Sequence, residues 1–334
     1  CIISSCWNSC RYIQKYGEKR SIAVFYKTLI VNKCIYSFNE PMEPKFNIGT
    51  AGWSYKDWVP NFYPKNQSAG FDWLQFYAHY FNCVEVNSTY YSYISPKVVD
   101  GWIRKVENTS DFVFHIKLHQ DFTHKRKYDE QNIKAVRYNL EQLKKSERLG
   151  GLLIQFPYSY SFDGNSVQYI QKLRNIFSDV SCFVEVRHQS WNNNRALDFF
   201  KENDLTFCTI DQPQIGRAIE FNPVVTNDKA YIRFHGRNAE AWRKSLANFG
   251  KPQTYQEQSS RYSYLYSPGE LVEIEQKIKS IQHKVKEVNV IMNNHPQGDA
   301  VANAFELIHL LEEKRKVDMP QTIVKAYQRL EEIQ

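Results

Sequence analysis

Eight short apolar runs, separated by stretches of helical periodicity, constrain the fold of this 334-residue chain more than any other feature. Strands that alternate with helices pair in parallel with their neighbours, and eight such units in about 250 residues are the number found in a (β/α)₈ barrel. We therefore expect an α/β fold of the TIM-barrel type. An open, doubly wound sheet is the alternative, because a single sequence does not give the order of the strands. The runs are 46–48, 83–86, 112–118, 152–156, 183–186, 207–210, 231–234 and 288–292.

The helical stretches carry recognisable start and stop signals. Ser95 and Pro96 suit the cap and first turn of a helix over 98–106, and 129–148 has one apolar face and ends before Gly150 and Gly151. Ser267 and Glu270 form a capping-box pattern that opens another helix. Two segments are irregular: 211–229 shows no helical pattern, and 236–266 is a long connection rich in Tyr, Ser and Gln. The barrel is therefore expected to be irregular between its sixth and seventh strands.

Residues 1–41 differ in composition from the rest of the chain. They hold four of the seven cysteines and six basic residues against two acidic ones. The spacing of Cys1, Cys6 and Cys10 lacks a paired C-x-x-C and a nearby histidine, as a metal or cluster site would need. The apolar run 22–31 is interrupted by a lysine and lacks the cleavage pattern of a secretory signal. We expect residues 1–41 to be a non-native or disordered leader and 42–334 to form a single domain.

Composition and charge limit the function classes. The chain is 42% hydrophobic and 15% aromatic, which excludes a disordered protein, and no stretch approaches the about 20 apolar residues of a membrane helix. The formal net charge is +7, but it falls to +3 without residues 1–41. Such a small excess argues against a polyanionic partner. Three cysteines then remain, all in predicted strands, as expected for buried thiols in the reducing cytoplasm: Cys83, Cys182 and Cys208.

Polar side chains share one face of most predicted strands. Residues two apart in a strand lie on the same side, and the apolar set should face the surrounding helices. The polar set should then face the barrel axis near the carboxyl ends of the strands, where barrel enzymes place their chemistry. This set consists of Glu85, Asn87, His115, Lys117, His119, Glu185, Arg187, Thr209, Asp211, Arg233 and His235, followed by Asn293, Asn294 and His295.

These groups predict an anion-binding site with acid–base chemistry. Guanidinium groups suit carboxylate or phosphate capture, and a Glu or His can serve as general acid or base. The competing interpretation is a buried ion network that closes the barrel, in which every charge is paired. The candidate catalytic residues are Glu185, Glu85, His235 and Asp211. The candidate ligand-binding residues are Trp53, Asn87, Lys117, Arg187, Arg233, Arg237, Asn293 and Asn294.

Cofactor chemistry receives little support from the sequence. His115, Glu185, Asp211 and His235 are ligand types for a divalent metal, but no local motif accompanies them, and Lys and Arg on the same face would repel a cation. No cofactor is required, and none is assigned. The sequence contains no G-x-G-x-x-G after a strand and no P-loop. Two carboxylates could also serve glycoside hydrolysis, which depends on a separation that sequence does not give.

Aromatic residues gather in the loops after three predicted strands. They include Trp53, Tyr90 and Tyr262. Packing of the loops onto the barrel explains them, and a stacking wall for a sugar ring or nucleobase beside the anion site is the functional alternative.

Eight motifs together resemble one known family. They are GTAGWSYKDW (49–58), FYP (62–64), VEVNSTYY (84–91), QFP (155–157), VEVRHQSW (184–191), RFHGR (233–237), YSYLYS (262–267) and NNHPQGDAVANA (293–304). In order and spacing, over about 46–311, they resemble the domain of unknown function 72 family. The resemblance implies a TIM-barrel-like fold and a shared site at these motifs, and it carries no catalytic role. Residues 1–41 have no counterpart in the family pattern.

Three function classes remain open on sequence. The first is an enzyme, of hydrolase, lyase or isomerase type, acting on a small anionic or sugar-like ligand. The second is a nucleic-acid-binding or processing protein that uses basic and aromatic loops. The third is a non-catalytic barrel that serves as an interaction scaffold. The sequence does not give the oligomeric state.

Overall fold

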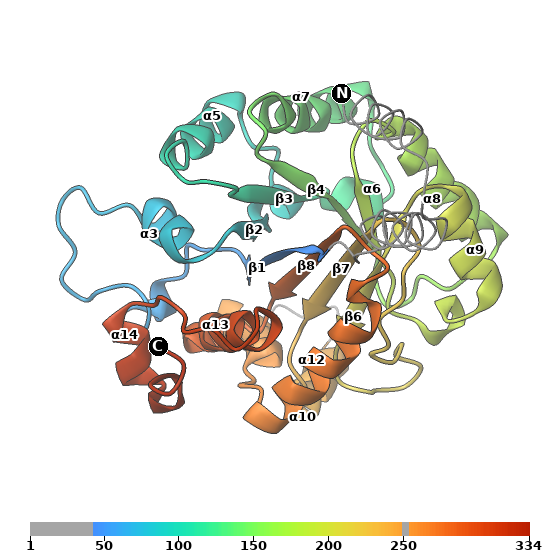
Figure 1. The fold of residues 1–334 in the computed structure, drawn as a ribbon. Coiled ribbons are helices and arrows are strands. Elements are labelled where there is room, and N and C mark those ends of the chain that lie inside the picture. The colour runs from blue at the N-terminus through green and yellow to red at the C-terminus, as the bar shows by residue number, and fades with distance from the viewer. Residues whose placement is uncertain (1–42, 249–253) are drawn as a thin grey trace, which may run out of the picture. The chain divides into compact units, whose positions relative to one another are not determined.

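The strands form a closed, all-parallel barrel in chain order, with β1 beside β8, in a computed structural model that describes residues 43–248 and 254–334. The predicted TIM-barrel fold is confirmed, and the helices surround the strands (Figure 1). The leader expected at residues 1–41 lies outside the described residues. The strands are β1 (Lys45–Ala51), β2 (Cys83–Val86), β3 (Val113–Lys117), β4 (Leu149–Gln155), β5 (Cys182–Glu185), β6 (Thr206–Asp211), β7 (Lys229–Phe234) and β8 (Glu287–Met292).

Helix boundaries follow the capping signals of the sequence. Asp129 and Asn132 form a capping box at the start of α7, and Ser267 and Glu270 form one at the start of α12. Pro96 begins α5 directly after Ser95. The α-helices are α3 (Trp73–Tyr80), α4 (Ser88–Tyr91), α5 (Pro96–Lys105), α6 (Gln120–Thr123), α7 (Glu130–Lys145), α8 (Gly164–Ile176), α9 (Asn194–Glu202), α10 (Ala239–Ala247), α11 (Tyr255–Ser259), α12 (Pro268–Gln282), α13 (Asp299–Leu311) and α14 (Gln321–Ala326). Short 3₁₀ turns are η1 (Lys56–Trp58), η2 (Gln189–Trp191), η3 (Ser260–Tyr262), η4 (Pro296–Gly298) and η5 (Gln328–Leu330).

Three local features differ from or refine the expectation. Gly150 and Gly151 lie inside β4 rather than at a helix end, because α7 already stops at Lys145. Residues 212–228 contain no helix, as expected. The long connection after β7 is partly helical, since it contains α10, α11 and η3.

Most strands place their side chains as the alternation predicts. Phe114 points outward from β3 and its ring stacks on Trp102 of α5, with 5.9 Å between centroids. His115, the next residue, points inward and lies against the rings of Phe183 and Tyr231, at 5.6 and 5.1 Å. The polar set of β3, β5 and β7 therefore faces the barrel axis.

The sixth strand reverses the predicted alternation. Thr209 lines a cavity on the helix side of the sheet together with Leu197 of α9. Phe207 packs on Phe200 of the same helix, at 5.1 Å between centroids. Residues of this parity face the helices, and Cys208, of the other parity, lies within the electrostatic influence of the carboxylates and guanidinium groups on the axis. The assignment of Thr209 and Asp211 to the axial face is therefore wrong.

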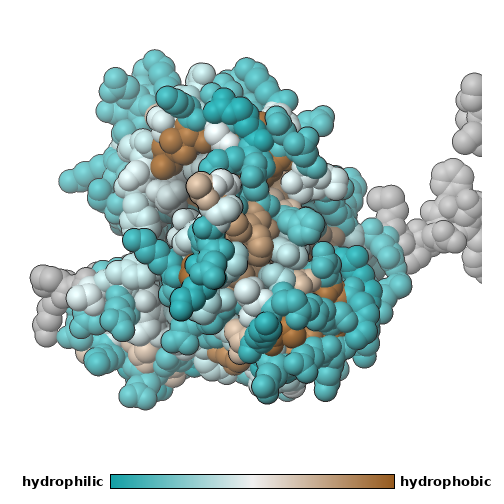
Figure 2. Space-filling view, turned by 90° about the vertical axis from the view of Figure 1, so that its left-hand side faces the viewer, coloured by the Kyte–Doolittle hydropathy of each residue, from teal (hydrophilic) through white to brown (hydrophobic). Residues whose placement is uncertain are grey.

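One face of the outer surface is mostly polar (Figure 2). On the face toward α3 and α14, hydrophilic side chains dominate and hydrophobic ones form small separate patches (Figure 2). In the part of the chain that the structure describes, no helix has the length and apolar character needed to cross a membrane.

Candidate active site at the barrel mouth

A buried ion network joins four strands at the carboxyl end of the barrel. Arg233 of β7 donates from Nε and Nη2 to both carboxylate oxygens of Glu85 on β2, at 2.8 and 2.6 Å. Its Nη1 donates to Glu185 of β5 and to Gln155 Oε1 of β4. The side chains of Arg233, Glu85 and Glu185 are at most 1% exposed. The guanidinium of Arg233 is thus fully engaged within the protein and is not presented to a ligand.

A second arginine continues this network toward the loops. Arg187, two residues after Glu185 and on the same face, donates from Nε to Glu185 Oε1 at 2.7 Å. Its Nη2 lies 3.2 Å from His235 Nε2, while Asn293 Nδ2 lies 2.8 Å from the Nδ1 of that ring. We refer to Glu85, Glu185, Arg187 and Arg233 as the mouth network. Two carboxylates and two guanidinium groups balance its formal charge.

The surroundings of the mouth network fix the protonation of Glu185 and of the adjacent His235. Although burial alone would raise it, Arg233 and Arg187 hold the pKa of Glu185 well below its usual range, so this carboxyl stays ionised at neutral pH. Burial, assisted by Arg187, lowers the pKa of His235 to about 3, so its ring is neutral. Neither group has a pKa suited to proton transfer near neutral pH.

Lys117 is the exception among the charged groups that the strands bring to the mouth. Its ammonium lies over the ring of Tyr90, with 4.6 Å between Nζ and the ring centroid. Among the described residues, Nζ makes no hydrogen bond and no ion pair. Burial and the nearby Arg233 lower the pKa of Lys117 from 10.5 to about 7. This amine therefore changes its charge near neutral pH.

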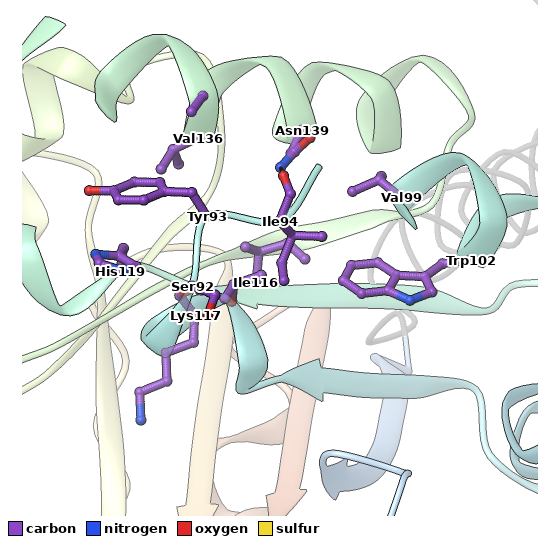
Figure 3. Close-up of a pocket in the computed structure, with 12 residues that line it drawn as sticks. Ser92, Tyr93, Ile94, Val99, Trp102, Ile116, Lys117, His119, Val136 and Asn139 are labelled. Atoms are coloured by element: carbon purple, nitrogen blue, oxygen red, sulfur yellow. Dashed lines mark hydrogen bonds between the residues drawn. The ribbon is translucent and has the colours of Figure 1, made fainter. Parts of the chain in front are cut away.

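Lys117 contributes part of its side chain to the lining of a neighbouring cavity, but its amine points away from that cavity (Figure 3). That cavity lies on the helix side of β3, lined by residues that include Tyr93, Trp102 and Asn139. Figure 3 shows the amine of Lys117 extending away from these side chains. Lys117 has the parity of His115, which faces the axis, so its amine belongs to the barrel mouth.

Aromatic rings surround the exposed side of the mouth network. Tyr90 lies 5.2 Å from His124, and Trp242 of α10 lies 5.7 Å from the guanidinium carbon of Arg187. Tyr262 lies 6.0 Å from Trp242 and 6.1 Å from His235. We call Tyr90, His124, Trp242 and Tyr262 the aromatic rim. Burial, followed by Lys117, lowers the pKa of His124 to about 4, so the rim adds no positive charge at neutral pH.

Asp211 and Arg237 form a separate cluster with each other. Arg237 Nε and Nη2 donate to the Asp211 carboxylate at 2.9 to 3.1 Å, and its Nη1 donates to Glu270 at 2.8 Å. Tyr266 donates its hydroxyl hydrogen to Asp211 at 2.5 Å. The reversed alternation of β6 explains this placement, because it turns Asp211 toward the segment before α12. Asp211 and Arg237 therefore form their ion pairs away from the mouth network, and they do not belong to the predicted site.

The other sequence-predicted residues divide between the mouth and its supports. Asn293 contacts His235, whereas Asn294 points to the helix side and donates to Asn303 of α13 at 2.9 Å. The ring of Trp53 packs edge-on against Trp102 at 5.7 Å, on the outer side of the barrel. Asn87 precedes α4, and its buried Oδ1 has no hydrogen-bond partner among the described residues.

Of the four residues considered as metal ligands, Glu185 and His235 lie 3.5 Å apart, but the other two do not join them. His115 lies below the mouth beside Tyr231, and Asp211 is held by Arg237. Over residues 43–248 and 254–334, no group of three His, Cys, Asp or Glu side chains is placed to hold a metal ion.

Sequence reasoning missed several contributors to the mouth. Gln155 and Tyr231 bind members of the mouth network. Tyr231 shares the parity of Arg233 on β7, a signal that could have found it, whereas Gln155 is the only polar side chain of β4 and has no such signal. Trp242 and His124 lie on segments after strands, where periodicity does not indicate which way a ring points.

Known proteins resemble this chain over most of its length. The model of the family described as "Protein of unknown function DUF72" matches residues 47–326. The UPF0759 protein YunF of Bacillus subtilis (strain 168) is 29% identical over 277 residues, which cover 79% of this chain and 94% of that protein. The UPF0759 protein YecE of Escherichia coli (strain K12) is 28% identical over 113 residues, which cover 34% of this chain and 38% of that protein.

Solved structures show the same similarity. The crystal structure of a DUF72 family protein from Thermotoga maritima MSB8 aligns with a TM-score of 0.69 and 30% identity, over 80% of this chain and 99% of the other. One from Enterococcus faecalis V583 aligns with a TM-score of 0.68 and 28% identity, over 80% and 95%.

Proposed function

This chain belongs to the DUF72 family of proteins of unknown function, and we propose that it is an enzyme that binds a small anionic ligand at the mouth of its barrel. Lys117 and Arg187 provide the positive charge, and Lys117 transfers the proton. The observation that carries this proposal is the unpaired state of the Lys117 amine, in a mouth where the other strand charges are paired. A partly buried cation without an internal partner loses hydration that only the opposite charge of a ligand would replace.

The proposal revises the roles expected of the carboxylates. Glu85 and Glu185 hold Arg233 and Arg187 in place, so they position the site rather than exchange protons with a ligand. A group with a pKa near neutrality suits general acid–base work, and at the mouth Lys117 has that property.

The distribution of charge supports a small ligand rather than a nucleic acid. Lys117 is partly buried, Arg187 is 8% exposed, and two carboxylates lie directly behind them. Nucleic-acid affinity grows with the number of phosphates that basic side chains neutralise, and two recessed cations with Arg261 over the rim rings can engage few. The aromatic rim offers ring faces on which a planar or sugar-like part of the ligand can pack.

We also propose that the protein resides in a reducing compartment such as the cytoplasm. Cys83, Cys182 and Cys208 are buried and unpaired within the described residues. Burial raises the pKa of the Cys182 thiol to about 12, which keeps this group protonated.

Binding of inorganic phosphate at constant ionic strength tests the proposal. Lys172 provides a matched control, because its ammonium also lies over a tyrosine ring, at 5.2 Å from Tyr128, but on the exposed face of α8. Calorimetry and thermal melts should show binding to the parent and to Lys172→Met, and affinity weaker by about tenfold or more in Lys117→Met. Equal affinity in all three proteins would contradict the proposal.

A further inference from the structure

The amine of Lys117 has the surroundings of a nucleophile rather than of a structural cation. Lys229, also on a strand, provides the contrast, because its Nζ is paired with Glu287 at 3.0 Å. Lys117 has no such acceptor among the described residues, although Glu85 and Glu185 are near enough to influence it electrostatically. Both carboxylates already form ion pairs with arginines. Neither is therefore available to pair with the Lys117 amine.

We propose that Lys117 forms an imine with the carbonyl group of its ligand, so that the ligand is a small anionic aldehyde or ketone. This inference rests on the proposed anion site and names the ligand class for it. Arg187, with its fixed charge, would hold the anionic group, and Lys117 would meet the carbonyl carbon.

The position of Lys117 is well defined by its backbone. Thr89 donates its hydroxyl hydrogen to the carbonyl of Lys117 at 2.7 Å and lies 2.8 Å from that of Val86, which ties the ends of β2 and β3 together. The Tyr90 ring then supports the side chain. A reacting group on a rigid strand end loses little entropy when it meets a bound carbonyl.

The chemistry balances without another reactant. The neutral amine attacks the carbonyl carbon, a C–N bond forms, and an amine proton moves to the oxygen. The resulting carbinolamine loses its hydroxyl group and a nitrogen proton as water and leaves the C=N bond. When protonated, this bond can withdraw an electron pair from the adjacent carbon, which is how amine catalysts promote cleavage or isomerisation next to a carbonyl.

The charges around the Lys117 amine leave much of it unprotonated at neutral pH, as a nucleophile requires. The groups that face it are Glu85 on β2, Tyr90 on α4, His124 after α6, Glu185 and Arg187 at the end of β5, and Arg233 on β7. Burial and the two arginines lower the pKa of Lys117 to about 7, whereas the carboxylates oppose this shift. About half of the amine is then neutral at pH 7, compared with less than about one in a thousand for an exposed lysine.

Reductive trapping tests the inference. The full chain is incubated with pyridoxal 5′-phosphate or glyoxylate, which are anionic aldehydes, and then with cyanoborohydride, which reduces an imine to a stable secondary amine. Peptide mass spectrometry then gives the labelling rate of each lysine. We expect Lys117 to be labelled about tenfold faster than Lys172 at pH 7, with a rate that falls below pH 7 as the amine is protonated.

Control variants and a neutral probe separate the possible failures. Lys117→Arg keeps the charge and should bind phosphate but lose the label, and Lys172→Met should keep both. If the aldehydes raise the Tm of the parent but Lys117 is not labelled preferentially, the imine is excluded and the anion site stands. Labelling by pyridoxal, which lacks the phosphate, as fast as by its phosphate would support the reactive amine and contradict the anion site. If the probes neither raise the Tm nor label Lys117, both proposals fail.

Discussion

The ammonium of Lys117 lies 4.6 Å from the centroid of the Tyr90 ring and forms no ion pair with a described residue. A cation over an aromatic face gains about 0.5–2 kcal/mol, less than a buried charge loses when it leaves water. The site therefore holds Lys117 at a cost to stability. Such a cost is typical of functional residues, whose environments are arranged for chemistry rather than for folding.

Removal of this amine should stabilise the protein. The pKa of Lys117 is about 7 in the folded protein, compared with 10.5 for an unperturbed lysine. The unfolded chain therefore binds this proton more tightly than the folded protein does, and the protonated amine lowers the free energy of unfolding. This loss of stability is greatest below pH 7, decreases as the pH rises, and is absent above pH 10.5. We expect Lys117→Met to raise the Tm by about 2 °C or more at pH 6 and by less at pH 9. Melts across this range check it, with Lys172→Met as the control; a lower Tm for Lys117→Met at pH 6 would show that the amine is structural.

Anion binding should weaken as the pH rises through about 7. An anion favours the protonated amine, so affinity is highest below the pKa of Lys117 and declines above it. Histidines at the mouth do not account for such a transition, because burial lowers the pKa of His295 and His124 to about 4 and that of His235 to about 3. Calorimetric titration with sulfate, whose charge is constant over this range, should show the transition in the parent. Its persistence in Lys117→Met would assign it to another group.

Arg233 should be essential for folding rather than for ligand contact. Arg233→Met leaves Glu85 and Glu185 buried without their shared partner, and the loss of one member of a buried ion pair costs about 3–5 kcal/mol. We expect the urea midpoint to fall steeply or the variant to be insoluble. Arg195→Met provides the control, because Arg195 is exposed. A parent-like urea midpoint for Arg233→Met would refute the structural role.

Two glycine substitutions should have opposite effects on stability. A Cβ on Gly150 would lie 2.4 Å from Cε1 of the buried His115 ring, which Phe183 and Tyr231 hold on either side. Gly150→Ala should therefore be destabilising by about 1–3 kcal/mol. Nothing lies within 4 Å of a Cβ on Gly101 inside α5, so Gly101→Ala should stabilise by about 0.5–1 kcal/mol. Chemical denaturation measures both; a neutral Gly150→Ala would mean that His115 can move.

Local sequence was sufficient to predict the units of the fold. The apolar runs, the Asp129 and Ser267 caps and the alternation in β3 depend on residues only a few positions apart. Each pattern reflects a physical preference of the local backbone or of one face of one element. Eight repeats of strand and helix then leave few architectures in which each strand is covered on its outer face.

The alternation in β6 shows where this reasoning ends. The polar residues Thr209 and Asp211 suggest an axial face, but the side chains that satisfy Asp211 come from residues 237 and 266, on the helix side. A carboxylate is stable wherever its partners are, and the sequence of the strand alone does not contain them.

The sequence by itself determined eight alternating strands and helices with charged and polar side chains at the carboxyl ends of most strands, and the tertiary structure closed the strands into a barrel. Only the tertiary structure decided which charges form ion pairs within the protein and which remain available to a ligand. Arg233 and Glu85, 148 residues apart in the chain, neutralise each other across the barrel, while Lys117 on the strand beside Glu85 is left without a partner. The physical reason is that ion pairing depends on distances of about 3 Å between atoms of different strands. Strand parity specifies a face of the sheet and leaves those distances undetermined.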